Sequence, residues 1–240
     1  MTPPGLRIAG RASVGDMPLF GELELICQPG AWTCLLGASG VGKTTLLRLA
    51  AGLATGVAFQ GDVTASDGAS LDGRIAYMAQ ADLLFPWLDV TGNVMLGARL
   101  RGEPPDPEKA ADLVKKVGLS ADTAKRPAQL SGGMRQRAAL ARTLMEDRPV
   151  VLLDEAFSAL DARTRAEMQE LSAELLAGRT VLQVTHEPAE AARLGHAIFV
   201  MNASGLGVAA TPSSSPIRAY DDPDVFACQS ALMAQIREAA

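Results

Sequence analysis

The stretch GASGVGKTT, residues 37–45, constrains the fold of this chain more than any other segment. It matches the pattern G-x-x-x-x-G-K-[ST] at every fixed position, and it lies between an expected strand at 32–36 and an expected helix at 45–53. Glycines at these positions let backbone N–H groups surround phosphate oxygens, and the helix N-terminus adds the positive end of its dipole. The stretch therefore predicts a phosphate-binding loop in an α/β sheet.

Two side chains of this loop have chemistry of their own. We expect the ammonium of Lys43 to reach the β- and γ-phosphates of a nucleotide as a mobile point charge, and the hydroxyl of Thr44 to bind Mg²⁺. A chance glycine turn before a helix would explain neither the lysine nor the preceding strand. The segment is therefore interpreted as a nucleotide site.

Polar residues follow two further expected strands. Asp154 and Glu155 end the run VVLLDE, and His186 ends the run TVLQVTH. Because ligands of open α/β sheets collect at the carboxyl ends of the strands, Asp154 is expected to bind Mg²⁺ and Glu155 to act as a general base toward water. His186 is expected to stabilise charge at the γ-phosphate. A lone histidine is more often structural, and this interpretation is kept for His196.

The distribution of apolar runs indicates an α/β core interrupted by helices. Residues 90–147 contain no convincing strand and have the pattern of a string of helices. After about residue 211 the chain is loop-like and then helical. Strands buried on both faces of a parallel sheet are expected at 74–80, 150–155, 180–186 and 196–202, and further strands at 6–9 and 22–27.

Composition argues against several classes of protein. The net charge is -5, and we find no basic stripe of the kind that nucleic acid requires, so no nucleic-acid partner is expected. No run of 18 apolar residues could span a bilayer, and the first residues lack the basic and apolar regions of a signal peptide. Cys27, Cys34 and Cys228 have neither zinc nor disulfide spacing, so we expect buried, reduced thiols in a cytosolic protein.

The octapeptide LSGGMRQR, residues 130–137, is a second glycine-rich helix start. Ser131 is placed to cap the helix, while Gly132 and Gly133 leave its first N–H groups open to an anion. An ordinary capped helix with accidental glycines is the alternative from these residues alone. Together with the phosphate loop, VVLLDE, SALD and His186 in this order, the octapeptide makes the chain resemble the nucleotide-binding subunits of ABC transporters.

This resemblance extends from about residue 6 to residue 210, and it implies a fold. The chain is expected to form a single ABC ATPase domain over residues 1–240, of α/β class. It would have a P-loop NTPase (RecA-like) core, an N-terminal antiparallel β lobe and an inserted α-helical subdomain. The core and lobe are expected at 1–88 and 148–210, the helical subdomain at 89–147, and a short tail at 211–240.

The resemblance also implies two ATP sites, each shared between two copies of the chain that ATP joins head to tail. ATP and Mg²⁺ held by the phosphate loop of one copy would be covered by Ser131 and Gly133 of the other. Gln80 matches a glutamine that contacts Mg²⁺ or water, and Asp161 in SALD matches an aspartate at the seam between the copies. The residues expected to contact the nucleotide are Gly37, Ala38, Ser39, Gly40, Val41, Gly42, Lys43, Thr44, Thr45, Ser131, Gly132, Gly133, Gln136 and Asp161. Those expected to bind the metal are Thr44, Gln80 and Asp154, and those expected to act in hydrolysis are Glu155, His186, Lys43 and Gln80.

One position departs from the family pattern. The family usually has an aromatic residue that stacks on adenine just before the glycine of the early loop, and this chain has Val14 there. The loss of a stacking ring predicts weaker binding and looser selection of adenine, by about 1–3 kcal/mol. Phe20 or another ring could take its place.

The segment ADLLFPWLDV, directly after Gln80, is similar to segments of nitrate, sulfonate, taurine and thiamine-pyrimidine importer ATPases. Trp87 is expected either in the core or in a groove that receives a short helix of a permease. We therefore expect an ATPase that drives uptake of a small solute (sulfonate, nitrate or pyrimidine-like) through a separate membrane permease, at the cytoplasmic side of the inner membrane. A periplasmic or extracellular solute-binding protein would be an indirect partner. An ABC-type ATPase not coupled to transport is the alternative, while a kinase or GTPase would leave the octapeptide unexplained.

Overall fold

The computed structural model describes residues 2–202 and 205–238. The chain forms two compact units. The first contains the residues up to Ile75, the segment Pro149–Glu155, and the residues from Gly178 onward, and the second contains Ala76–Arg148 and Ala156–Ala177. Each unit is built around its own layer of buried side chains.

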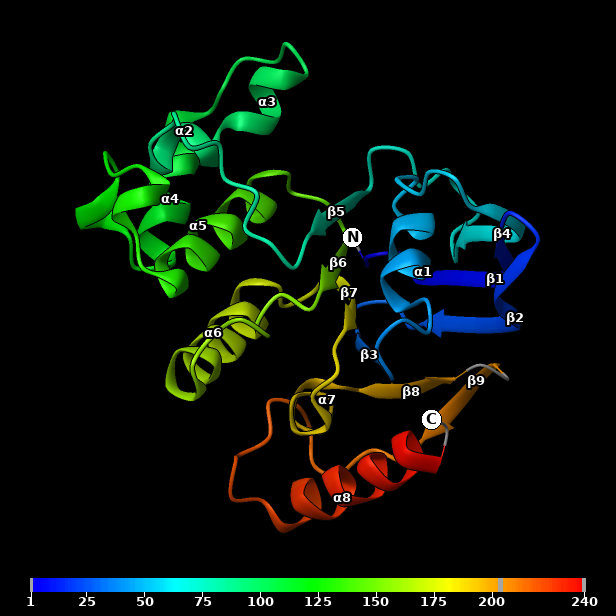
Figure 1. Ribbon diagram of the computed structural model, residues 1–240. Coiled ribbons are helices and arrows are strands. Elements are labelled where there is room, and N and C mark those ends of the chain that lie inside the picture. The colour runs from blue at the N-terminus through cyan, green and yellow to red at the C-terminus, as the bar shows by residue number, and fades with distance from the viewer. Residues whose placement is uncertain (1, 203–204, 239–240) are drawn as a thin grey trace. The chain divides into compact units, whose positions relative to one another are not determined.

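A three-stranded antiparallel sheet forms the N-terminal part of the first unit (Figure 1). Its central strand β1 (Leu6–Val14) pairs with β2 (Met17–Cys27) on one side and with β4 (Ala58–Ala65) on the other. Alternate residues of β1 are buried, which is the pattern of a sheet that packs through one face. Gly10 has a φ of 139°, and a Cβ there would collide with the carbonyl of Gln60, so the close approach of β4 requires glycine at this position.

The larger sheet has the strand order β5-β6-β7-β3-β8-β9. Its strands β6, β7 and β3 are buried at every residue and pair in parallel. Helix α7 packs on β3, and α8 packs on α7 and β8 (Figure 1). The bounds of these elements are β3 (Trp32–Gly37), α1 (Lys43–Ala50), β6 (Val150–Asp154), β7 (Thr180–Val184), α7 (Pro188–Leu194), β8 (Ala197–Asn202), β9 (Gly205–Ala209) and α8 (Pro223–Glu238). Strand β5 (Ile75–Met78) belongs to the second unit except for Ile75.

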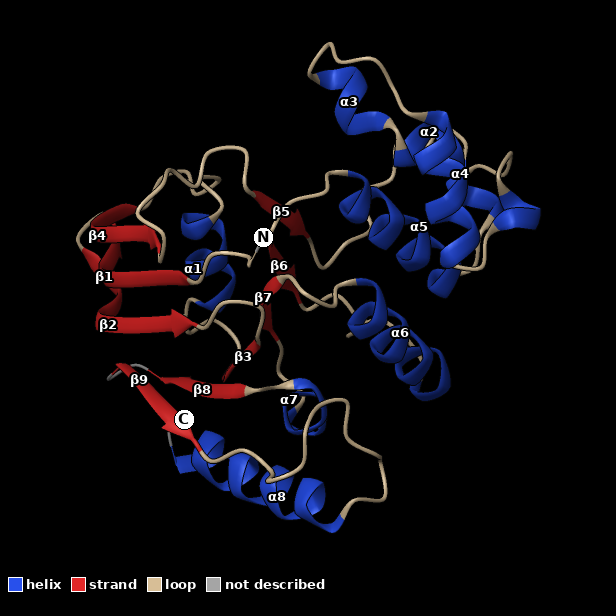
Figure 2. Ribbon diagram, turned by 180° about the vertical axis from the view of Figure 1, so that it is seen from behind, coloured by secondary structure: helices blue, strands red, loops and turns tan. Residues whose placement is uncertain are grey.

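The second unit is helical (Figure 2). Its long helix α5 contacts α2, α3, α4 and α6, and it buries a row of apolar residues against them. Aspartates cap three of these helices, because the carboxylates of Asp89, Asp106 and Asp161 accept N–H bonds in the first turns of α2, α4 and α6. The elements are α2 (Val90–Val94), α3 (Leu96–Leu100), α4 (Pro107–Lys116), η1 (Ser120–Asp122), η2 (Pro127–Gln129), α5 (Gly132–Met145) and α6 (Ala162–Leu175).

The expected fold class is confirmed: a mainly parallel α/β sheet, an antiparallel lobe and an inserted helical segment are all present. Sequence patterns missed β4 and β9, because neither strand has the buried or strictly alternating pattern that marks a strand. The helix after the phosphate loop begins at Lys43, two residues before the expected position. Within the described ranges, no helix is long and apolar enough to cross a membrane.

Candidate nucleotide site

The phosphate loop owes its shape to three glycines with positive φ. Gly37, Gly40 and Gly42 have φ values of 155°, 83° and 106°, which L side chains rarely adopt. Gly37 is also buried, and a Cβ there would collide with the carbonyl of Met201 on β8. The loop conformation therefore depends on glycine at these positions, as the motif predicts.

Helix α1 begins at the end of this loop with its first N–H groups open. Its N-cap is Gly42, no side chain caps it, and no acidic residue lies in its first turn. Four N–H groups at a helix start lack intrahelical partners, and the dipole makes that end positive. This helix start can therefore bind an anion without displacing a side chain of the protein.

The ammonium of Lys43 lies inside the phosphate loop. It donates to the carbonyl oxygens of Gly37 and Ala38, at 2.8 Å each, and the residue is only 5% exposed. Burial lowers the pKa of Lys43, while the carboxylates of Glu155 and Asp154 act in the opposite direction. The positive charge thus lies in the loop, near the two carboxylates at the end of β6.

Thr44 and Asp154 form a pair of oxygen ligands. The Thr44 hydroxyl donates to Asp154 Oδ1 at 2.8 Å, and Asp154 is 3% exposed at the end of β6. Neighbouring ligands of an octahedral Mg²⁺ are about 2.9 Å apart, so the two oxygens suit one edge of its coordination shell. Among the described residues no group of three His, Cys, Asp or Glu side chains could hold a metal. Mg²⁺ is usually held by one or two protein oxygens together with phosphates and water, and this pair fits that arrangement.

Glu155 lies directly beyond β6 in a strained conformation. Its φ is 46°, and its N–H donates to the carbonyl of Val184 at 3.0 Å, which ties it to β7. Its Oε2 lies 3.1 Å from Nδ1 of His186, the residue that follows β7 and Thr185. Non-glycine residues in this region of φ cluster at functional sites, because the surrounding structure must impose them. The two side chains are in contact at the carboxyl edge of the sheet.

The octapeptide forms the helix start that the sequence predicts. The Ser131 hydroxyl accepts the N–H of Met134 at 3.3 Å and so caps α5, while Gly132 and Gly133 are its first two residues. A Cβ on Gly133 would lie 2.6 Å from Cγ2 of Thr164, whereas one on Gly132 would meet nothing closer than 3.9 Å. Gly133 is therefore required by packing as well as by any role toward a ligand.

Gln80 and Asp161 are also placed in the second unit. The Gln136 amide donates to the carbonyl of Gln80 at 3.2 Å, and the Gln80 amide lies 3.5 Å from the hydroxyl of Ser158. Asp161 caps α6 by accepting the N–H of Thr164 at 3.1 Å, and hydrogen bonds with Thr164 lower its pKa. The expected seam aspartate is thus a helix cap in the single chain.

The structure brings the expected residues together as two sets, one in each unit. The first unit contains Gly37, Ala38, Ser39, Gly40, Val41, Gly42, Lys43, Thr44, Thr45, Asp154, Glu155 and His186. The second contains Gln80, Ser131, Gly132, Gly133, Gln136 and Asp161.

Sequence reasoning missed two arginines of α5 that hold the segment after Gln80. Arg142 donates to the carbonyls of Asp82 and Leu83, at 2.7 Å each, and Arg135 donates to the carboxylate of Asp82 at 3.0 Å. Leu83 has a φ of 48°, so these bonds fix an unfavourable backbone conformation. The seven-residue spacing of the arginines, which places them on one helix face, was the available signal.

Several other expectations need correction. Trp87 is 66% exposed, so the core interpretation was wrong. Phe20 is 2% exposed inside the β lobe and cannot offer a ring to a base in place of Val14, which is half exposed. Cys228 is only partly buried, unlike Cys27 and Cys34.

Comparisons with known proteins agree with this geometry. The family model described as "ABC transporter" matches residues 20–158, which include the phosphate loop, the octapeptide and both carboxylates. The chain belongs to the ABC transporter ATP-binding family. It is therefore an ATP-binding protein and an ATPase, as expected.

Three relatives illustrate the range of named proteins in this family. The chain is 42% identical to an uncharacterized ABC transporter ATP-binding protein of Haemophilus influenzae, over 91% of this chain and 92% of the relative. It is 40% identical to the aliphatic sulfonates import ATP-binding protein SsuB 1 of Rhodococcus jostii, over 85% and 83%. It is 39% identical to the sulfate/thiosulfate import ATP-binding protein CysA 1 of Rhizobium meliloti, over 89% of this chain but 63% of that longer relative.

Proposed function

We propose that this ABC ATPase powers import of a small solute through a separate membrane permease, and that it acts at the cytoplasmic face of the membrane. The names of relatives in the import class support this direction of transport. Among the expected solutes we favour a sulfonate over nitrate or a pyrimidine. The support for this choice is the relative named as an aliphatic sulfonates import ATP-binding protein, which is 40% identical over 85% of this chain. A solute-binding protein is an indirect partner in this proposal.

The pair of Glu155 and His186 is the observation that supports the proposed chemistry most directly. Mg²⁺, when bound, would be held by Thr44 and Asp154 and would neutralise charge on the phosphates. Glu155 would accept a proton from the attacking water, and His186, 3.1 Å away, would orient this carboxylate and stabilise charge at the γ-phosphate. Lys43 needs to exchange its two carbonyl partners for phosphate oxygens when ATP binds.

Glu155→Gln tests the general base. The amide keeps the shape of the side chain but cannot take a proton, so kcat should fall at least about 100-fold while the affinity for ATP changes little. Glu174→Gln, an exposed change of the same kind on α6, should have no effect. Wild-type turnover by Glu155→Gln in a steady-state phosphate-release assay would show that another group is the base.

The helix start at Ser131 is proposed to complete the ATP site of a second copy of the chain. Ser131 is exposed and Gly133 is only partly buried, and the cap leaves other N–H groups of the first turn of α5 open. Ser131→Arg should block hydrolysis without weakening binding of ATP to the single chain. Loss of ATP binding in the same variant would instead indicate damage to the fold.

The permease is proposed to dock at a hollow of about 360 Å³ in the second unit. The hollow is lined by an exposed tryptophan, Trp87, and by charged residues that include Asp89, Arg99 and Arg126. The ring of Phe85, 5.0 Å away, packs against Trp87 and supports it. A large ring surrounded by charges suits the end of a short amphipathic helix. Trp87→Ser should leave hydrolysis by the chain alone unchanged and reduce solute uptake by the assembled transporter.

A further inference from the structure

Arg218 is a loop arginine with its guanidinium buried among backbone carbonyls. It precedes α8 and is 4% exposed. It donates to Ser214 and Pro212 in its own loop, at 2.7 and 3.3 Å. It also donates to Ala192 and Gly195 at the end of α7, at 2.8 and 2.9 Å. Neither the sequence motifs nor the matched family region, which ends at residue 158, includes it.

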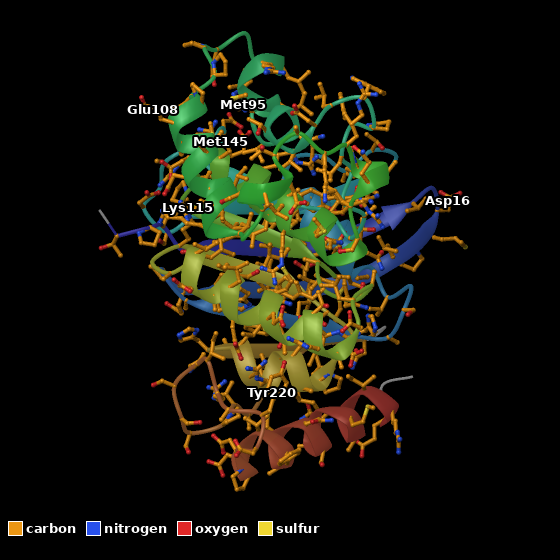
Figure 3. The ribbon with its side chains drawn as sticks, turned by 90° about the vertical axis from the view of Figure 1, so that its left-hand side faces the viewer. Asp16, Met95, Glu108, Lys115, Met145 and Tyr220 are labelled. Carbon is orange, nitrogen blue, oxygen red and sulfur yellow. The ribbon has the colours of Figure 1, made fainter. Side chains whose placement is uncertain are left out.

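The contacts of Arg218 hold the C-terminal end of α7. Helix ends leave carbonyls without intrahelical partners, and the dipole makes them negative, so a buried guanidinium is a strong anchor there. Two further hydrogen bonds join the same segments: the backbone N–H of Arg218 donates to the Arg193 carbonyl at 3.2 Å, and the side-chain Nε of Arg193 donates to the Arg218 carbonyl at 3.0 Å. The Arg193 guanidinium also lies 3.3 Å above the ring of Tyr220, which is labelled beside α7 in Figure 3.

The other end of α7 leads directly to His186. The helix has seven residues, its N-cap is Glu187, and no side chain caps it there. The His186 side chain is 44% exposed, and its imidazole lies 3.1 Å from Glu155 Oε2 and 3.8 Å from Oε1 of Glu187, the N-cap of α7. The N–H of Glu187 donates to the hydroxyl of Thr185 at 3.1 Å, so the start of α7 is tied to the residues on both sides of His186. Backbone hydrogen bonds link the two ends of the helix, from Ala191 N–H to the Glu187 carbonyl at 3.3 Å and from Gly195 N–H to the Ala191 carbonyl at 2.9 Å, so an anchor at the C-terminal end also constrains the N-terminal end.

We infer that Arg218 is a positioning residue for His186: by holding the last carbonyls of α7, it keeps the imidazole within reach of Glu155. The inference rests on the proposed part of His186 in hydrolysis. All the groups concerned lie in the first unit.

The test replaces Arg218 by Met in the full chain, with Arg237→Met, an exposed arginine in the last turn of α8, as the matched control. Because the chain has only two histidines, an imidazole NMR spectrum contains two sets of signals, and His186→Ala assigns them. In Arg218→Met the His186 signal should shift and broaden, and kcat should fall on the order of threefold to tenfold with the KM for ATP changed less than about twofold. The control should match wild type in both measurements.

A double-mutant cycle separates positioning from general damage. In the His186→Ala background, Arg218→Met should have almost no further effect on kcat, because the residue it positions is gone. An unmoved His186 signal in Arg218→Met, or an equal loss of kcat in both backgrounds, would overturn the inference. If His186→Ala alone hydrolyses ATP at the wild-type rate, the proposed role of His186 is wrong, and the imidazole signal then decides whether Arg218 positions it. Should Arg218→Met fail to fold, Arg218→Lys keeps the charge with fewer donors, and an intermediate shift of the His186 signal is expected.

Discussion

Gly133 offers a sharp test of how packing and function combine at the octapeptide. A methyl group at this position would lie 2.6 Å from Cγ2 of Thr164, well inside the 3.4 Å at which ordinary contacts begin. At the neighbouring Gly132 the nearest atom, in Arg135, would be 3.9 Å away. The two adjacent glycines therefore make a matched pair, since only one of them is confined by a neighbouring helix.

The expected free energies follow from this geometry. Replacing glycine by alanine in a helix stabilises it by about 1 kcal/mol, and Gly132→Ala should show some of this gain. In Gly133→Ala the same gain is opposed by an overpacking cost of about 1–3 kcal/mol. Thr164→Ser removes Cγ2, and because Thr164 is half buried this should cost less than about 0.8 kcal/mol. In the double variant the clash is absent. The effect of Gly133→Ala on the free energy of unfolding should therefore differ by about 1–3 kcal/mol between the wild-type and Thr164→Ser backgrounds, and this difference is the coupling of the two residues.

Urea unfolding of wild type, Gly133→Ala, Thr164→Ser and the double variant, followed by circular dichroism, measures this coupling. A coupling below about 0.5 kcal/mol, or equal destabilisation by Gly132→Ala and Gly133→Ala, would refute the packing argument. ATP hydrolysis by the double variant then isolates the proposed role. The double variant should still hydrolyse ATP slowly although its fold is restored. The new methyl group covers the N–H groups that are proposed to contact the phosphates bound by a second copy.

Three further predictions concern other parts of the first unit. Burial and the charge of Arg218 lower the pKa of His196, so the unfolded chain takes up the proton more readily. The free energy of unfolding should therefore fall as the pH drops through about 6.5. Urea unfolding at about pH 8 and about pH 5.5 measures this fall, and His196→Gln should make it smaller. An equal fall in His196→Gln and wild type would show that His196 is not the titrating group. Burial raises the pKa of Cys27 to about 12 and also raises the pKa of Cys34. A thiol-reactive aromatic disulfide should therefore label only Cys228 in the native protein, and early labelling of Cys27 or Cys34 would contradict their burial. Val14→Tyr should tighten ATP binding by about 1–3 kcal/mol in a titration, and an unchanged affinity would show that no base stacks at this strand end.

The sequence predicted those parts of the site whose geometry is local. The loop at Gly37 and the cap at Ser131 each depend on residues a few positions apart, so their motifs specify the conformation directly. The positions of Asp154 and His186 at strand ends also followed from buried runs of the right length. These features are decided by backbone sterics, by hydrogen bonds within a turn and by the burial of whole strands.

Elements without a strong local pattern could not be predicted. Strand β4 is exposed at most positions, and it exists because β1 offers it a full antiparallel register. For Trp87 the sequence left a core position and a surface groove both open, and the structure places it at the surface, 66% exposed. In both cases the outcome depends on the partner surface and not on the segment itself.

The sequence by itself determined that this chain has a phosphate loop, a capped glycine helix start and strand-end carboxylates, and thereby its membership of the ABC ATPases. The tertiary structure alone decided which groups meet: Thr44 with Asp154, 110 residues later, Glu155 with His186, 31 residues later, and Arg218 with the end of α7. The physical reason is that a motif fixes dihedral angles and caps over a few residues. The distance between two side chains far apart in the chain is set by how whole strands and helices pack.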